Sequence, residues 1–247
     1  MKKFYLGFTL AEVLITLGII GIVAAMTLPT LIQNQQKRSL EVATQKFYSN
    51  MSQAVKKYMA DEGVDDLRNT PLTAIDDDDA ERAQKACEDF VQKYLKVAKV
   101  CEDGCFADNY TLQSGEITTE IGAKADTDYN VKGRFVLSDG TVIDITAGET
   151  VGLNEPISLY VDINGKKAPN KIGYDLWSMD IFYDGSIDEN NINPDCKMNS
   201  GPENCNRTGW GNSPKEVRDN RFERCRDGGT YGGCFGHFLE NGFKFDY

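Results

Sequence analysis

GFTLAEVLITLGIIGIVAAMTLPTLI, residues Gly7–Ile32, is the stretch that decides the fold of this chain. It contains a single charged residue, Glu12, and no residue from Val13 to Ile32 is charged. At about 1.5 Å per helical residue, the uncharged run is about 30 Å long, which is the thickness of the hydrocarbon core of a bilayer. We therefore expect a helix that spans a membrane or packs among similar helices.

A cleaved secretory signal peptide is the main alternative for this stretch. The apolar part of such a peptide is usually about 7–15 residues long and ends at small residues before a cleavage site. The run here is longer, has no Ala-x-Ala exit, and continues directly into a second helical pattern. We therefore interpret it as a retained helix.

The residues after the uncharged run continue the helix but confine its apolar side chains to one face. The pattern predicts one helix from about Phe8 to about Ala60, ended at Gly63. Apolar residues recur at spacings of three and four, at Leu40, Ala43, Phe47, Met51, Ala54 and Tyr58. We expect the helix to leave the membrane near Gln33 and to pack this stripe on a folded body.

The composition separates an apolar N-terminus from a polar remainder. The chain has 247 residues, enough for one or two small domains with a core. Its formal net charge is −11. Because phosphate binding needs a basic surface, we expect no nucleic acid partner for the body as a whole.

Seven cysteines indicate the compartment in which this body resides. The last four lie in a glycine- and asparagine-rich stretch with few apolar residues, where cross-links would replace a missing core. Zinc is the alternative, but there is no CxxC pair and His237 is the only histidine. Disulfide bonds would place the body outside the cytoplasm. The candidates are Cys101, Cys105, Cys196, Cys205, Cys225 and Cys234, with Cys196–Cys205 and Cys225–Cys234 as predicted pairs among the three possible connectivities of the last four.

The rest of the chain predicts a second helix followed by a sheet. Four aspartates at 76–79 are expected to begin a helix from about Ala80 to Val100, with a cation site as the alternative use of these carboxylates. The strand candidates are the two halves of the Arg134–Ile145 hairpin around Asp139-Gly140, then Ile157–Ile163 and Trp177–Tyr183. Sequential strands usually form an antiparallel meander, and the apolar stripe would cover one face. Residues 188–234 are predicted to be loops, and residues 235–247 a short hairpin.

The N-terminus combines Lys2-Lys3, a short leader ending at Gly7, the sequence Phe8-Thr9-Leu10-Ala11-Glu12, and an uninterrupted apolar helix with Pro29. This combination resembles the class III signal of type IV pilins and type II secretion pseudopilins. The resemblance implies an α+β fold, a pilin-like roll. In it, a long N-terminal helix, membrane-spanning in its first half and amphipathic in its second, packs on an antiparallel sheet beside a disulfide-stapled C-terminal region.

The resemblance also implies a route of processing and assembly. A membrane prepilin peptidase would cut between Gly7 and Phe8 and methylate the new amine of Phe8. An inner-membrane assembly platform would then move the subunit from the lipid into a filament of identical or related subunits. The domains would be a leader (1–7), a transmembrane or filament-core helix (8–32) and an extracytoplasmic globular domain (33–247).

Four residues of the apolar helix have expected roles. A charged residue at a helix centre in hydrocarbon costs roughly 2.5–3.5 kcal/mol on insertion scales. The resemblance implies that Glu12 pairs with the amine of Phe8 on a neighbouring subunit, whereas a carboxylate at headgroup level is the alternative. Pro29 is expected to break, weaken or kink the helix, because it cannot donate a hydrogen bond. Gly21 and Ala25 allow close helix packing, although such residues are also common in membrane helices.

The leading hypothesis is a structural subunit of a type IV pilus or a type II secretion pseudopilus. The protein would reside in the inner membrane with its body outside, then in a filament in the periplasm or at the cell surface. A minor pilin that binds a surface, cargo or DNA is the second hypothesis, and a membrane-anchored enzyme is the third. We expect no enzyme, cofactor or metal, since no Ser/His/Asp arrangement, phosphate loop or HExxH motif is present. Calcium at Asp162, Asn164 and Asp175 is an open alternative to turn formation.

Overall fold

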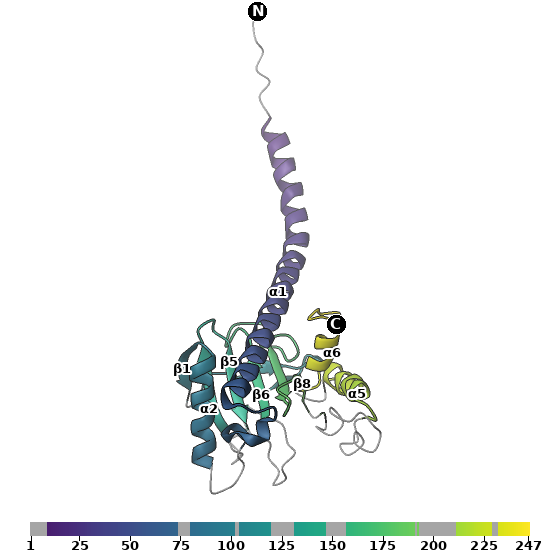
Figure 1. The fold of residues 1–247 in the computed structure, drawn as a ribbon. Coiled ribbons are helices and arrows are strands. Elements are labelled where there is room, and N and C mark those ends of the chain that lie inside the picture. The colour runs from purple at the N-terminus through teal and green to yellow at the C-terminus, as the bar shows by residue number, and fades with distance from the viewer. Residues whose placement is uncertain are drawn as a thin grey trace, which may run out of the picture. The chain divides into compact units, whose positions relative to one another are not determined.

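A computed structural model describes residues 9–73, 80–101, 104–119, 131–146, 157–190, 192, 211–228 and 232–247. The chain separates into two compact units, Met1–Ser39 and Leu40–Tyr247, which are described one at a time. Figure 1 shows the ribbon and labels the main elements. The 120–130 and 193–210 segments, which include Cys196 and Cys205, lie outside the described residues.

The first helix, α1, spans Leu10–Glu62 and matches the single long helix expected from the sequence. Up to Ser39 none of its described residues is buried. From Leu40 onward one face is buried, comprising Leu40, Glu41, Thr44, Phe47, Met51, Ala54, Val55, Tyr58 and Met59. The helix stops at Gly63, where φ is +70° and the amide donates to the carbonyl of Ala60 at 3.2 Å.

Six strands form one antiparallel sheet in the order β1-β4-β5-β6-β7-β8. Their bounds are Val97–Cys101, Val131–Leu137, Val142–Thr146, Ile157–Asp162, Leu176–Ile181 and Ile187–Glu189. From β4 to β8 each strand pairs with the next in sequence, which is the predicted meander. Two further strands, β2 (Tyr110–Thr111) and β3 (Ile117–Thr118), form a separate small sheet.

The β4–β5 connection is the hairpin that Asp139-Gly140 predicts. Leu137 and Thr141 close the turn with a 2.8 Å hydrogen bond from the amide of Leu137 to the carbonyl of Thr141. Gly140 has φ of +93°, a conformation that glycine adopts without steric cost.

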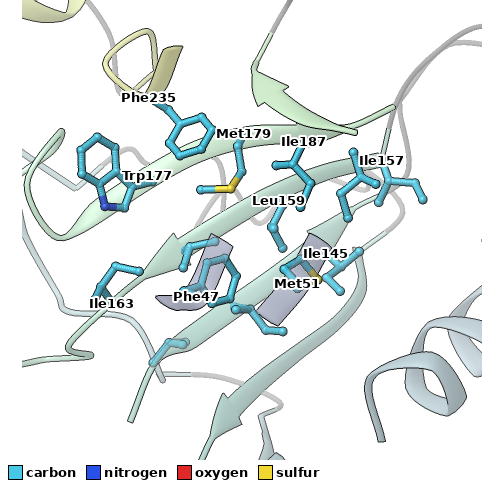
Figure 2. Packing of buried hydrophobic residues seen from close by; sticks show 14 of the residues in the cluster. Phe47, Met51, Ile145, Ile157, Leu159, Ile163, Trp177, Met179, Ile187 and Phe235 are labelled. Carbon is cyan, nitrogen blue, oxygen red and sulfur yellow. The ribbon is translucent and has the colours of Figure 1, made fainter. Parts of the chain in front are cut away.

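The core of Leu40–Tyr247 lies between α1 and one face of the sheet. Figure 2 shows Phe47 and Met51 of α1 packed over the inward side chains of β5 to β8, including Ile145, Leu159 and Met179. Met51, Leu159 and Met179 have no exposed surface. This burial confirms that the apolar stripe of α1 covers the sheet, and with it the predicted α+β class.

Helices flank both ends of this sheet (Figure 1). The α2 helix, Ala80–Tyr94, lies near β1 and β4, whereas α5 (Pro214–Arg226) and α6 (Phe235–Glu240) lie near β8. Two 3-10 turns, Leu67–Asn69 and Pro71–Thr73, follow α1.

The prediction of a helix that continues to Val100 is wrong. The α2 helix ends at Tyr94, and Val97–Cys101 forms the edge strand β1. Val97 and Ala98 fit the apolar spacing of the helix, but the segment pairs with β4, where Val97 is opposite Leu137 and Val100 is opposite Phe135. A partner strand thus outweighed the helical pattern.

The prediction of loops over 188–234 and of a C-terminal hairpin is also wrong where the structure describes these residues. Helix α5 begins at a capping sequence, in which the Ser213 side chain accepts a 3.2 Å hydrogen bond from the amide of Glu216 and Pro214 occupies the first turn. Ser-Pro-x-Glu is a recognisable helix start that the sequence interpretation passed over. Helix α6 replaces the first half of the expected hairpin.

Candidate functional site

The N-terminal end of α1 is capped by three reciprocal hydrogen bonds between Thr9 and Glu12. The Glu12 carboxylate accepts from the Thr9 amide at 2.8 Å and from the Thr9 hydroxyl at 2.7 Å. The Glu12 amide donates to the Thr9 hydroxyl at 3.3 Å. This is a capping box, which satisfies amides that the first turn leaves without partners. Gly7 and Phe8, the expected cleavage and methylation residues, lie outside the described residues.

The capping role of Thr9 was missed at the level of sequence. Thr-x-x-Glu before an apolar run is a known helix-start signal, and Thr9-Leu10-Ala11-Glu12 fits it. Glu12 therefore has a partner within its own chain, in addition to the neighbouring amine that the resemblance implies.

The 10–32 part of α1 presents apolar side chains on almost its whole circumference. An 18-residue window of α1 has a mean hydropathy of 2.2, and none of it is buried. A side-chain carbon added at Gly18 or Gly21 would meet no atom within 4 Å. This part of the helix is long and apolar enough to cross a membrane, and its glycines leave room for the close approach of another helix.

Pro29 lies inside α1, and the helix continues through it. The expected break at Pro29 is therefore absent from this structure. A proline removes one backbone hydrogen bond and does not by itself end a helix whose other turns are intact. Weakening of the helix at Pro29 during assembly stays a prediction.

Two disulfide bonds are present in the described residues. Cys225 at the end of α5 is joined to Cys234 at the start of α6, which is the predicted pair. Cys101 of β1 is joined to Cys105. Cys87 is buried in α2 and belongs to neither bond. The predicted pair of Cys196 and Cys205 lies outside the described residues.

The two carboxylates for which calcium was the alternative are Asp162, the last residue of β6, and Asp175, the last residue before β7. Asp175 accepts hydrogen bonds from the amides of Asn170 at 2.7 Å and Lys171 at 2.6 Å. Asp162 accepts from the hydroxyl of Tyr110 and from the amide of Asn164. Turn formation accounts for both carboxylates, because their oxygens face hydrogen-bond donors of the chain.

Burial raises the pKa values of both carboxylates, Asp162 and Asp175. Burial raises the pKa of Asp162 to about 7, and the charge of Asp175 acts in the same direction. Burial likewise raises the pKa of Asp175 to about 6, against the opposing effect of its backbone hydrogen bonds. Among the residues that the structure describes, no group of three or more His, Cys, Asp or Glu side chains is arranged to hold a metal ion.

Two models of known protein families match this chain, one at its N-terminus and one over most of the remainder. Residues 3–28 match the prokaryotic N-terminal methylation motif. Residues 30–182, more than half of the chain, match a family of unknown function (DUF6613). The chain belongs to this family. No curated protein and no solved structure matches it.

The methylation motif confirms the N-terminal resemblance, because this DUF6613 member has an N-terminal signal like that of type IV pilins and pseudopilins. The motif spans the start of α1, including the capping box and the two glycines with open space. The family match covers the rest of α1 and the sheet up to β7, and it stops before α5 and α6. The apolar helix and this motif together are consistent with membrane anchoring and an extracytoplasmic filament.

Proposed function

We propose that this protein is a structural subunit of an extracytoplasmic filament, either a type IV pilus or a type II secretion pseudopilus. The methylation motif directly before an apolar helix is the observation that supports the proposal most strongly. Since the apolar surface of this helix is not buried by the described part of the chain, it needs lipid or other helices around it. Membrane lipid would surround it before assembly, and neighbouring subunits afterwards.

The proposed maturation acts on Gly7 and Phe8. A prepilin peptidase would cut between them, and the same enzyme would methylate the amine of Phe8. A glycine before the cut lets an extended backbone enter a protease cleft without a side-chain clash. The protein itself would be no enzyme, since its role would be to pack α1 into a filament and to present its body outside the membrane.

The mass of the mature N-terminus tests this proposal. We expect the membrane protein to begin at a methylated Phe8, and a Gly7→Leu variant to retain its leader because the bulky side chain blocks the cut. Intact-mass spectrometry of both proteins distinguishes the two states. A Gly7→Leu protein that still begins at Phe8 would contradict the peptidase step, and an unprocessed natural protein would contradict the proposal as a whole.

A minor subunit that binds a partner through its body is the second candidate. The observation that favours it is a lysine-lined groove on Leu40–Tyr247, described below. Abundance separates the two roles, because a major subunit should dominate sheared filaments whereas a minor one should be scarce in them.

A further inference from the structure

A groove of about 660 Å³ opens between α1, the end of α2 and the β4–β5 turn. All of its lining lies within Leu40–Tyr247. Its apolar lining includes Phe47, Met51 and Leu137, and its rim has four lysines. We call this site the lysine groove and define it by its lysines, which are Lys46, Lys57, Lys93 and Lys96.

Two of the four lysines form exposed ion pairs. Lys46 lies 3.2 Å from Asp139, and Lys93 lies 3.2 Å from Asp61, with about three-fifths of each lysine side chain exposed. Exposed pairs of this kind contribute about 0–1 kcal/mol, so an anionic ligand that binds the lysine more strongly can replace the aspartate of either pair. Both ammonium groups therefore remain accessible to a ligand.

The other two lysines, Lys57 and Lys96, are exposed and form no ion pair with a carboxylate in the described part of the chain. Lys57 lies 6.0 Å from the ring centre of Tyr94, which also lines the groove. Lys57 and Lys96 thus lie next to an apolar floor without a direct ion pair, although the charge of Lys57 also acts on Asp61 one helical turn away.

The charge of the groove is opposite to that of the whole chain. Its lining contains four lysines and a single acidic residue, Asp139, whereas the chain has a formal net charge of −11. A cleft lined by one sign of charge attracts the opposite sign locally. Charges beyond about 8 Å are screened at physiological ionic strength, so a short anion senses mainly the lysines. A long polyanion such as DNA would also meet the acidic surface around them.

We propose that the lysine groove binds a short acidic segment of a partner protein. Carboxylates of the segment would lie at the lysines, and an apolar side chain would lie on the floor formed by Phe47, Met51 and Leu137. Lysine presents a compact charge that can bind a single carboxylate oxygen without a fixed bidentate geometry. A volume within the usual range of about 300–1,000 Å³ for ligand sites accommodates several side chains.

A labelled synthetic peptide with glutamates around one tryptophan is the probe for this site. It would be titrated into the full chain in detergent micelles and followed by fluorescence anisotropy. The test variant is Lys57→Glu with Lys96→Glu. The matched control is Lys56→Glu with Lys99→Glu, which changes the net charge equally at neighbouring positions outside the groove.

We expect the test variant to weaken peptide binding at least about tenfold and the control variant less than about threefold. Binding should also weaken as salt is raised. Circular dichroism confirms that each variant is folded, and Lys57→Gln with Lys96→Gln replaces the test variant if charge reversal unfolds it.

Three results would overturn the proposal. The first is that the peptide does not bind at low salt, and the second is that the test and control variants lose peptide affinity equally. The third is that a single-stranded oligonucleotide binds more tightly than the peptide and that this binding depends on Lys57 and Lys96. The experiment uses the unassembled chain, so its failure leaves the filament proposal intact, and an unprocessed N-terminus leaves the groove proposal intact.

Discussion

Glu12 is the residue for which sequence and structure give two different partners. The resemblance assigns its carboxylate to the amine of a neighbouring subunit, whereas the structure shows it bound to the amide and hydroxyl of Thr9. The two roles are compatible, because a carboxylate has about four acceptor positions and the cap uses one oxygen. The cap would hold the carboxylate at the helix end, where a neighbouring cation could reach it.

Substitutions of Thr9 and Glu12 separate these roles. Thr9→Val removes the hydroxyl of the cap but leaves the carboxylate, so we expect filament yield to stay within about twofold of the natural protein. Glu12→Ala removes both functions, and we expect a protein that is processed and inserted but assembles poorly. The readout is the subunit recovered in sheared filaments relative to the membrane fraction. If both variants lose filaments equally, Glu12 acts through the helix cap rather than through a neighbour.

At the scale of elements, a buried carboxylate of α1 binds the end of the chain, where Phe243 also packs on Tyr48 of α1 with ring centres 5.1 Å apart. Glu41 accepts a 2.9 Å hydrogen bond from the amide of Phe245 and a 2.8 Å hydrogen bond from the ammonium of Lys244. Phe245 also stacks on Tyr174, with ring centres 4.7 Å apart. Glu41, an acidic residue on the buried face of α1, therefore connects this helix to the C-terminal residues by hydrogen bonds.

We expect Glu41→Ala to lower the free energy of unfolding by about 1–3 kcal/mol, because it leaves the amide of Phe245 without its acceptor. Denaturant unfolding of the full chain in detergent measures the change. Glu62→Ala, at an exposed position of the same helix, is the control and should change stability by less than about 0.5 kcal/mol. Equal stability of the two variants would show that the carboxylate does not hold the C-terminal residues.

The elements that the sequence predicted well have either a long periodic pattern or a tight turn formed by adjacent residues. The α1 helix has a periodic stripe, and the β4–β5 hairpin has a turn that only a few residue types permit. The β1 strand was missed because its pairing with β4 joins residues more than thirty positions apart. The α5 helix was missed for another reason, since its start signal at Ser213 is local and readable.

At the scale of the whole molecule, several carboxylates are buried in the Leu40–Tyr247 unit. Besides Asp162 and Asp175, Glu189 of β8 is fully buried and accepts hydrogen bonds from the amides of Gly233 and Gly236, at 3.0 and 2.7 Å. Burial raises its pKa to about 7, against the opposing charge of Arg221. These carboxylates tie β6, β7 and β8 to the loops and helices around them, at a cost in desolvation.

The raised pKa values predict that acid stabilises the fold. Between about pH 4 and pH 7 the folded chain binds more protons at Asp162, Asp175 and Glu189 than the unfolded chain, so stability falls as pH rises through this window. We expect the melting temperature of the full chain to be several degrees higher at pH 5 than at pH 7.5.

Thermal unfolding followed by circular dichroism at both pH values measures this effect. Asp162→Asn, which removes one titrating group and keeps an oxygen near Tyr110, should reduce the pH dependence. A melting temperature that rises from pH 5 to pH 7.5 would contradict the prediction.

The sequence by itself determined the features whose physical cause lies within a short stretch of chain. The charge-free length from Val13 to Ile32, the stripe that begins at Leu40 and the Asp139-Gly140 turn each specify their structure locally. Only the tertiary structure decided the features that form when residues far apart in the sequence come into contact. The edge strand β1 needs β4 beside it, Asp162 needs Tyr110, and the lysine groove combines lysines from α1 with lysines near the end of α2. A linear pattern reports which face of an element is apolar, but only folding selects the residues that this face meets.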